Sequence, residues 1–181
     1  MRRVRRAALE DVPAVARLVQ LPPTGPDCPD EVPRAVVRLV LAHVGLDLGE
    51  VWVAVDDGRV VSALALLAPQ DAGGAEALLL SLRLDLGLTT LPGDELLSDA
   101  WLLLPVTPGP EPLRTLLARA LPAVDHSGRP AVAVAPGAVD PALWAAGFTR
   151  LAPGAPLLVR PGVPSLAGTA SGTALGPDRR P

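Results

Sequence analysis

The chain has 181 residues, of which 49% are hydrophobic, and its formal net charge at pH 7 is −3. This length suits one domain, and the apolar fraction is enough to bury a core, which excludes a wholly disordered protein. The acidic balance gives no electrostatic footprint for nucleic acid, so we expect no nucleic-acid partner. No apolar run approaches the roughly 18 residues that a membrane helix needs, so we expect no membrane span.

The choice of residues is strongly biased. Lys, Asn, Ile and Tyr do not occur, and all 16 basic side chains are Arg. The missing residues have AT-rich codons, so the bias indicates a GC-rich bacterial genome such as that of an actinomycete, and it weakens arguments from arginine content. The start, MRRVRR, resembles the basic segment of a signal peptide, but Glu10 and Asp11 interrupt the apolar stretch that should follow. We therefore expect a cytoplasmic protein.

Few side chains suggest reactive chemistry by themselves. The single cysteine, Cys28, excludes an internal disulfide and has no histidine beside it, which argues against a nucleophilic thiol. The two histidines lack the spacing of a metal site or a catalytic triad, and we expect His126 at a helix C-terminus and His43 in packing or at the surface. Four arginines near the start are interpreted as flanks of a strand rather than a phosphate site: Arg2, Arg3, Arg5 and Arg6.

The first quarter of the chain predicts one short strand and two helices. Residues 4–7 can form the strand, and Asp11 offers an N-cap for a helix whose apolar positions 12, 15, 16 and 19 share one face. A second helix is expected from about residue 30 to Gly45, because glycine suits a C-terminal stop. Its apolar stripe consists of Val32, Val36, Leu39, Val40 and Val44.

The next segment carries the strongest turn signal in the chain. Residues 51–55 and 60–67 are strand-like runs that flank Asp57-Gly58, a dipeptide typical of two-residue hairpins. Beyond this hairpin we expect a loop at residues 69–74, a leucine-rich helix at 76–88 and another loop at 89–94.

The second half predicts strands that alternate with helices. Residues 99–104 form a buried strand that ends at Pro105, and residues 113–124 have the apolar spacing of a helix. We expect Pro122 to kink or shorten that helix, because proline lacks an N–H and clashes with the preceding turn. The remaining elements are a strand at 131–135, a short helix begun by Asp140-Pro141 and ended by Gly147, and a strand at 157–160.

This order mixes hairpins with crossover helices, which implies an α/β fold with a mixed sheet and helices on its faces. We expect one domain at residues 1–160. Residues 161–181 contain mostly Gly, Ser, Pro, Thr and Ala, so we expect a disordered tail there.

Several segments resemble the GNAT superfamily of N-acetyltransferases. The opening VRRAALEDVPAVARLV is similar to its first strand and helix. The blocks VGLDLGEVWVAVDDGRVVSALAL and SGRPAVAVAPGAVDPALWAAGFTRL, together with the Ala100-Trp101 pair, are similar to the puromycin N-acetyltransferase subgroup. The resemblance covers about residues 3–160 and implies a mixed, mostly antiparallel sheet with a splayed parallel central pair.

The resemblance also implies acetyl-CoA as cofactor, held between the two central strands. Its pantetheine arm would lie along the earlier strand, and its pyrophosphate would meet the start of the next helix, where unpaired N–H groups attract anions. Carried over position by position, the cofactor contacts are Leu102, Leu103, Leu104, Gly109, Glu111, Leu113 and Arg114.

The loop at residues 105–114 departs from the family pattern. Gly109 keeps a glycine, whereas Glu111 and Leu113 stand where two others are expected. Three further positions lack an N–H altogether: Pro108, Pro110 and Pro112. The carboxylate of Glu111 would repel pyrophosphate, whereas Arg114 offers a charged donor to it.

The residues for proton transfer also differ from the family pattern. Val134 stands where the subgroup has a glutamate, and Leu143 where it has a tyrosine. Asp99, at the start of the central strand, is a candidate catalytic base, with a solvated strand-end carboxylate as the alternative interpretation. Three tryptophans either line a pocket or belong to the core: Trp52, Trp101 and Trp144.

Two functions follow as hypotheses. In the first, the protein is an N-acetyltransferase that moves an acetyl group from acetyl-CoA to a small-molecule amine. In the second, it is a catalytically inactive GNAT-fold binding or interaction module that has lost acetyl-CoA. The protein is expected to be a monomer or a homodimer, and a neighbouring copy could complete the site.

Overall fold

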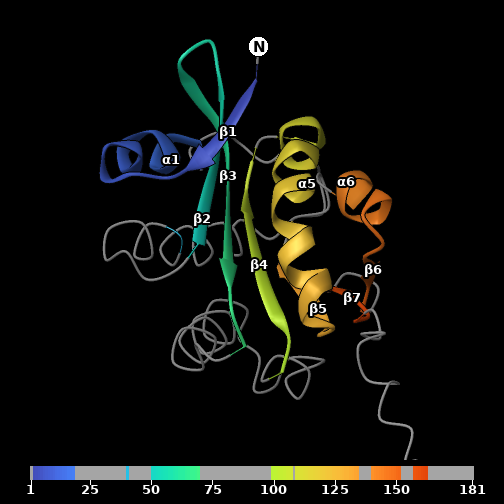
Figure 1. Cartoon of the computed structure of the whole chain (residues 1–181). Coiled ribbons are helices and arrows are strands. Elements are labelled where there is room, and N and C mark those ends of the chain that lie inside the picture. Colours follow the sequence, from blue (N-terminus) through green and yellow to red (C-terminus); the bar gives the residue numbers. More distant parts are fainter. Residues whose placement is uncertain are drawn as a thin grey trace, which may run out of the picture.

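The computed structural model describes residues 2–18, 40, 50–69, 99–107, 109–134, 140–151 and 157–162. Within these ranges, seven strands form one sheet in the order β1-β2-β3-β4-β5-β7-β6. The strands are β1 (Arg3–Arg6), β2 (Glu50–Asp56), β3 (Arg59–Leu67), β4 (Trp101–Val106), β5 (Ala131–Val134), β6 (Thr149–Arg150) and β7 (Leu157–Arg160). The helices are the 3₁₀ turn η1 (Leu9–Asp11), α1 (Val12–Leu18), α5 (Pro110–Ser127) and α6 (Asp140–Ala145) (Figure 1).

The sheet is antiparallel except at its centre, where β4 and β5 run parallel with α5 as the crossover. The parallel ladder is short: it joins Trp101 to Ala131, Leu102 to Val132 and Leu103 to Ala133. Beyond Leu103, β4 stays paired with β3, whereas β5 continues beside β7. The expected mixed sheet with a parallel central pair is therefore confirmed, and the two central strands part after three residue pairs.

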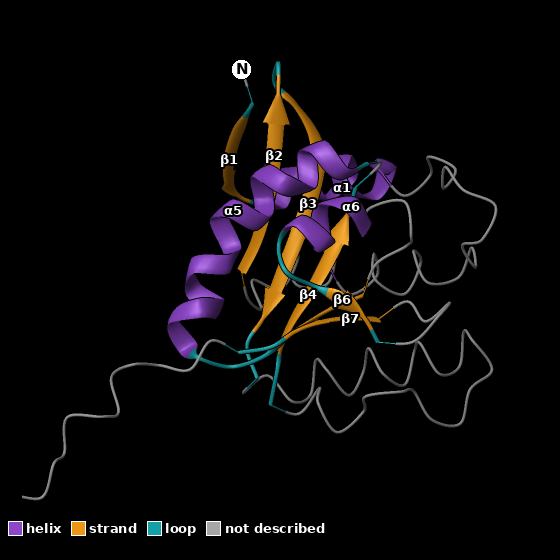
Figure 2. Cartoon of the chain, turned by 90° about the vertical axis from the view of Figure 1, so that its right-hand side faces the viewer, coloured by secondary structure: helices purple, strands orange, loops and turns teal. Residues whose placement is uncertain are grey.

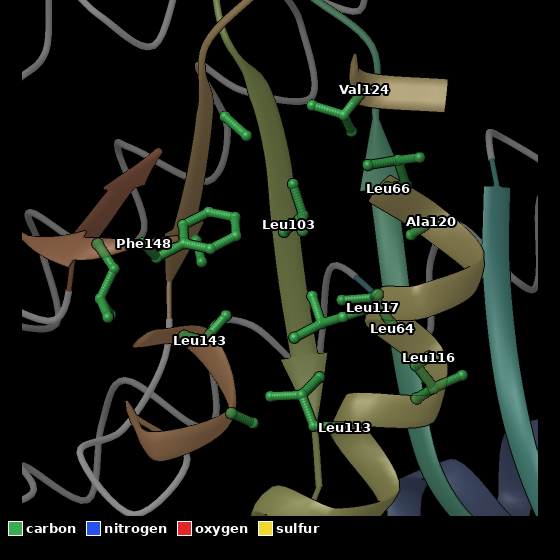
Figure 3. Packing of buried hydrophobic residues seen from close by; sticks show 14 of the residues in the cluster. Leu64, Leu66, Leu103, Leu113, Leu116, Leu117, Ala120, Val124, Leu143 and Phe148 are labelled. Atoms are coloured by element: carbon green, nitrogen blue, oxygen red, sulfur yellow. The ribbon is translucent and has the colours of Figure 1, made fainter. Parts of the chain in front are cut away.

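Each face of the sheet has its own hydrophobic core. Along β4, Leu102 and Leu104 join one core, which also contains Val15 of α1, and Leu103 joins the other. Helices α5 and α6 cover this second face (Figure 2). Its buried side chains include Leu113, Leu116, Leu117, Ala120 and Val124 of α5 and Leu143 and Phe148 (Figure 3). This alternation is what a strand buried on both faces requires, and helices on both faces are confirmed.

The predicted hairpin of β2 and β3 is confirmed. Asp57 and Gly58 both have positive φ angles, 47° and 75°. A type I′ turn needs this conformation at both central residues, and its twist matches that of the flanking strands. The hairpin also contains a β-bulge between Ala54 and Val55.

The interpretation of Asp11 as a simple N-cap of the first helix is wrong. Asp11 ends the 3₁₀ turn that precedes α1, and its carboxylate accepts the N–H of Ala8, 2.8 Å away. The same carboxylate accepts two hydrogen bonds from the Arg5 guanidinium, at 2.6 and 2.7 Å. These bonds from Arg5, helped by the Ala8 N–H, lower the pKa of Asp11 although burial opposes the shift. The acidic residue therefore ties the first strand to the first helix.

Two prolines behave differently from expectation. Helix α5 starts at Pro110 and continues five residues past Pro122, to Ser127, so Pro122 does not shorten it. Pro122 lies on the exposed face, where water can solvate the carbonyl that loses its partner. Pro105 does not end the central strand either, because it lies inside β4 and opposite Leu64 of β3.

At the C-terminal side, α6 ends at Ala145, and the predicted stop, Gly147, lies in the turn that follows it with a φ of 84°. The strand β6, only two residues long, has too little sequence pattern to be predicted. The predicted second helix lies outside the described residues except for Val40, which is helical and buried. The helix at 76–88, the loop at 89–94, nearly all of the loop at 69–74, Cys28, His43 and the tail beyond Gly162 also lie outside them.

No helix within the described part of the chain is long and apolar enough to cross a membrane.

Candidate functional site

The candidate site lies where β4 gives way to α5. Thr107 follows the strand, and Gly109 is the N-cap of the helix that begins at Pro110. The Thr107 hydroxyl donates to the Gly109 carbonyl at 2.9 Å and accepts the Gly109 N–H at 3.4 Å. The Thr107 side chain thus bonds to both backbone groups of Gly109. The Gly109 N–H, the first donor of the helix N-terminus, is therefore already used.

The start of α5 is poor in free donors. In any α-helix the N–H groups of the N-cap and the next three residues lack a partner within the helix. Here these positions are Gly109, Pro110, Glu111 and Pro112. The two prolines have no N–H and Gly109 is bonded to Thr107, so the N–H of Glu111 is the one that has no partner among the described residues.

Leu113 and Arg114 lie one and two positions beyond the unpaired N–H groups at the helix start, so their backbone cannot donate to a ligand. Their backbone donors fall within the hydrogen-bonded turns of the helix, which use the carbonyls four residues earlier. The Leu113 side chain is fully buried in the core beneath α5. The Arg114 guanidinium bonds to the Glu111 carboxylate at 2.5 Å. The positive charge of Arg114 is therefore already paired with the negative charge of Glu111, in the first turn of the helix.

The edge of β4 that faces β5 is also poor in donors. The Trp101 N–H donates towards this side, to the carbonyl of Pro130 at 2.9 Å. Because successive backbone groups in a strand alternate in direction, Leu103 and Pro105 face the same side. The ladder with β5 covers Leu102 and Leu103. Pro105, beyond the ladder, offers an acceptor and no N–H.

Asp99, the candidate base, lies at the other end of the central strand. The whole of β4 separates it from Thr107, which corresponds to about 20 Å at the rise of a strand. Its carboxylate bonds to the Arg129 guanidinium at 2.5 Å, and both side chains are largely exposed. The structure therefore does not bring Asp99 together with Gly109, Glu111 or Arg114.

The two substituted positions belong to the core. Val134 ends β5 and is buried in the core on the α1 side. Leu143 of α6 is buried in the other core, close to Phe148 (Figure 3). Each therefore presents a hydrocarbon side chain without a proton to exchange. His126 lies in the last turn of α5, as predicted, at the far end of the helix from the site.

The tryptophans differ in their surroundings. Trp52 and Trp101 pack at the margin of the core under α5, and the indole N–H of Trp101 donates to the Ser127 hydroxyl at 2.8 Å. Trp144 is 56% exposed on α6. None of the described His, Cys, Asp and Glu side chains forms a group of three that could hold a metal ion.

No family model matches the chain, and no curated protein matches its sequence. Among solved structures, the chain is similar to a polyamine N-acetyltransferase from Drosophila melanogaster, with a TM-score of 0.48 and 14% identity. The similarity covers 82% of this chain and 83% of the other.

The cofactor-binding roles of Leu102, Leu103 and Leu104 and of Gly109, Glu111, Leu113 and Arg114 stay predictions, as does a catalytic role for Asp99. Thr107 and Pro105 were not singled out as site residues, although each changes the number of donors there. A threonine two residues before a helix-starting glycine is the signal that indicates such a hydroxyl bond. The residues present fit the pyrophosphate of acetyl-CoA poorly.

Proposed function

We propose that this protein is an N-acetyltransferase-like scaffold that no longer binds acetyl-CoA tightly and works as a binding or interaction module. The observation that carries the proposal is the start of α5, where one backbone N–H out of four positions has no partner in the described part of the chain and can meet a phosphate oxygen. A hydrogen bond to a charged group contributes about 1.5–3 kcal/mol. Losing two or three of them weakens binding by a factor of about a hundred or more.

Further support comes from the surrounding side chains. Glu111 adds a negative charge where phosphates would lie, and Arg114 is paired with it. Val134 and Leu143 leave the described part of the site without the carboxylate and the phenol that the resemblance implies for proton transfer. Each of these features weakens either cofactor binding or catalysis, and they occur together.

One observation favours the second candidate function, an N-acetyltransferase that acts on a small-molecule amine. The ladder between β4 and β5 ends after three pairs, and α5 begins directly after β4. This is the layout in which the resembling family holds its cofactor. Acetyl transfer to an amine depends mainly on in-line positioning of the two reactants, so an enzyme without dedicated proton-transfer groups would be slow rather than inactive.

Titration of the full chain with acetyl-CoA in a calorimeter separates the two candidates. We expect no saturable heat and no thermal shift up to about 1 mM acetyl-CoA, a concentration at the upper end of ordinary KM values. Saturation with a Kd tighter than about 100 μM would overturn the proposal. Release of free thiol from acetyl-CoA in the presence of amines would then assign the enzyme instead.

A further inference from the structure

Two arginines meet one indole ring on the α5 face of the sheet, at its β1 edge. Trp52 of β2 lies opposite Arg6 of β1 in the antiparallel ladder. The Cζ atom of Arg6 is 5.7 Å from the centre of the Trp52 ring, and that of Arg119, from α5, is 4.7 Å from it. The three side chains come from three elements of the fold, so the backbone fixes their positions. We call them the Arg-Trp-Arg corner.

The guanidinium of Arg119 is positioned but unneutralised. Arg6 pairs with Glu50 at 2.5 Å, whereas no carboxylate of the described residues pairs with Arg119. A guanidinium held over an indole ring by its positive charge keeps N–H donors that the ring does not occupy. Arg119 is exposed to solvent. A ligand would therefore meet a charged fork that the indole ring already orients.

A second donor at the corner lacks an acceptor. The indole N–H of Trp52 is buried and has no hydrogen-bond partner within the described residues. Buried donors in proteins are almost always bonded, and an orphan donor points to a water or ion that completes the site. The two guanidinium carbons lie no more than about 10 Å apart, because both are within 6 Å of one ring centre. Donors thus outnumber acceptors at this corner.

We infer that the Arg-Trp-Arg corner is a binding site for carboxylate groups. A carboxylate can present two oxygens to the guanidinium fork. Arg6 already makes a single hydrogen bond to a carboxylate oxygen within the chain, that of Glu50. The net charge of −3 disfavours association with an extended polyanion, so the ligand carries one or a few carboxylates. This site does not depend on acetyl-CoA, because it uses the β1 edge of the sheet and not the start of α5.

Binding can be followed through Trp52, whose fluorescence reports on the stacked arginine. The full chain is titrated at low salt with citrate and, separately, with a diglutamate peptide. The wild-type protein should show a saturable fluorescence change with a Kd below about 1 mM, and Trp52→Phe should lose that change. Saturation by citrate assigns a small carboxylic acid as ligand, and saturation by the peptide alone assigns an acidic segment of a partner protein.

Variants make the test specific. Arg119→Gln should weaken binding by about tenfold or more, and Arg119→Lys, which keeps the charge without the fork, should restore it only in part. Arg17→Gln is the matched control, because it removes an exposed arginine from α1, on the other side of the sheet. Absence of a saturable change with both probes, or equal losses in Arg119→Gln and Arg17→Gln, would overturn the inference.

Discussion

Asp11 shows how a single side chain fixes the start of the fold. Its carboxylate is buried and accepts bonds from Arg5 and from the Ala8 N–H. We predict that Asp11→Asn lowers the free energy of unfolding at pH 7 by about 1.5–3 kcal/mol, because the charged hydrogen bonds to Arg5 are lost while the shape is kept. Urea denaturation of both proteins measures this difference.

The same pair predicts a dependence on pH. The pKa of Asp11 is lower in the folded chain than the value of about 3.9 expected when unfolded. Its stabilising effect is therefore complete above pH 4 and is lost as the pH falls through the folded pKa. The difference between wild type and Asp11→Asn should shrink below pH 4. Glu10→Gln, which removes an exposed carboxylate one residue away, should show no comparable loss at pH 7, and an equal loss would contradict this account.

Gly162 is a second residue whose role is steric. A Cβ atom added there would lie 2.2 Å from the carbonyl oxygen of Gly128, which belongs to the backbone and cannot rotate away. We predict that Gly162→Ala destabilises the protein by about 1–3 kcal/mol, the usual cost of forced overpacking. Gly109→Ala is the control for thermal unfolding, because a Cβ at Gly109 meets nothing within 4 Å. Equal melting temperatures for the two variants would show that the backbone yields.

Individual residues were predictable from sequence where the signal is local. The positive φ angles at Asp57 and Gly58 follow from the dipeptide alone. The direction of the Asp11 carboxylate could not be predicted in this way, because an aspartate at the start of a helix can bond to the helix that follows it or to the strand that precedes it. The choice here depends on Arg5, which the pairing of β1 with β2 places beside it.

At the scale of the element, α5 links the fold to the proposed function. If missing donors at its start weaken acetyl-CoA binding, as we propose, replacing the prolines should strengthen it. We predict that Pro110→Ala combined with Pro112→Ala binds acetyl-CoA at least about tenfold more tightly than wild type, because each change adds an N–H at an unpaired position. Calorimetric titration measures the change.

Pro122→Ala provides the control within the same helix. It also replaces a proline by alanine on α5, but in the exposed middle of the helix and away from its start. This variant should gain stability, because a missing hydrogen bond is restored, and should keep the affinity of the wild type. If Pro122→Ala and the double variant bind acetyl-CoA equally, the number of donors at the helix start does not determine the affinity for acetyl-CoA.

The elements themselves were predictable to different degrees. The apolar spacing of α5 indicates a helix, but its length was underestimated, because an exposed proline costs less than the burial of the leucines around it gains. Pro105 was expected to stop β4, yet the strand continues through it. The backbone nitrogen of Pro105, which carries no hydrogen, faces away from β3, so the ladder between β3 and β4 loses no hydrogen bond. The residue preferences within this segment could not show which strand would pair with each edge of β4.

For the whole molecule, the two-faced sheet follows from pattern alone. Strands such as β4 are apolar at successive positions, which predicts helices on both sides, and the structure has two separate cores. The chemistry of the site was less accessible. The number of unpaired N–H groups at the site changes if α5 starts one residue earlier or later. Sequence patterns do not locate the end of a helix to within one residue.

The short ladder between β4 and β5 has a consequence for motion. Strands β1 to β4 form one half of the sheet and β5, β7 and β6 the other, and among the residues that the structure describes three pairs join the halves directly. Such a narrow junction is where a sheet opens first, so the two halves can unfold as separate cooperative units. In hydrogen–deuterium exchange, amides of Leu103 and Val132 should then exchange before those of the hairpin of β2 and β3. The chain would behave mechanically as two small sheets bridged by α5 rather than as one rigid sheet.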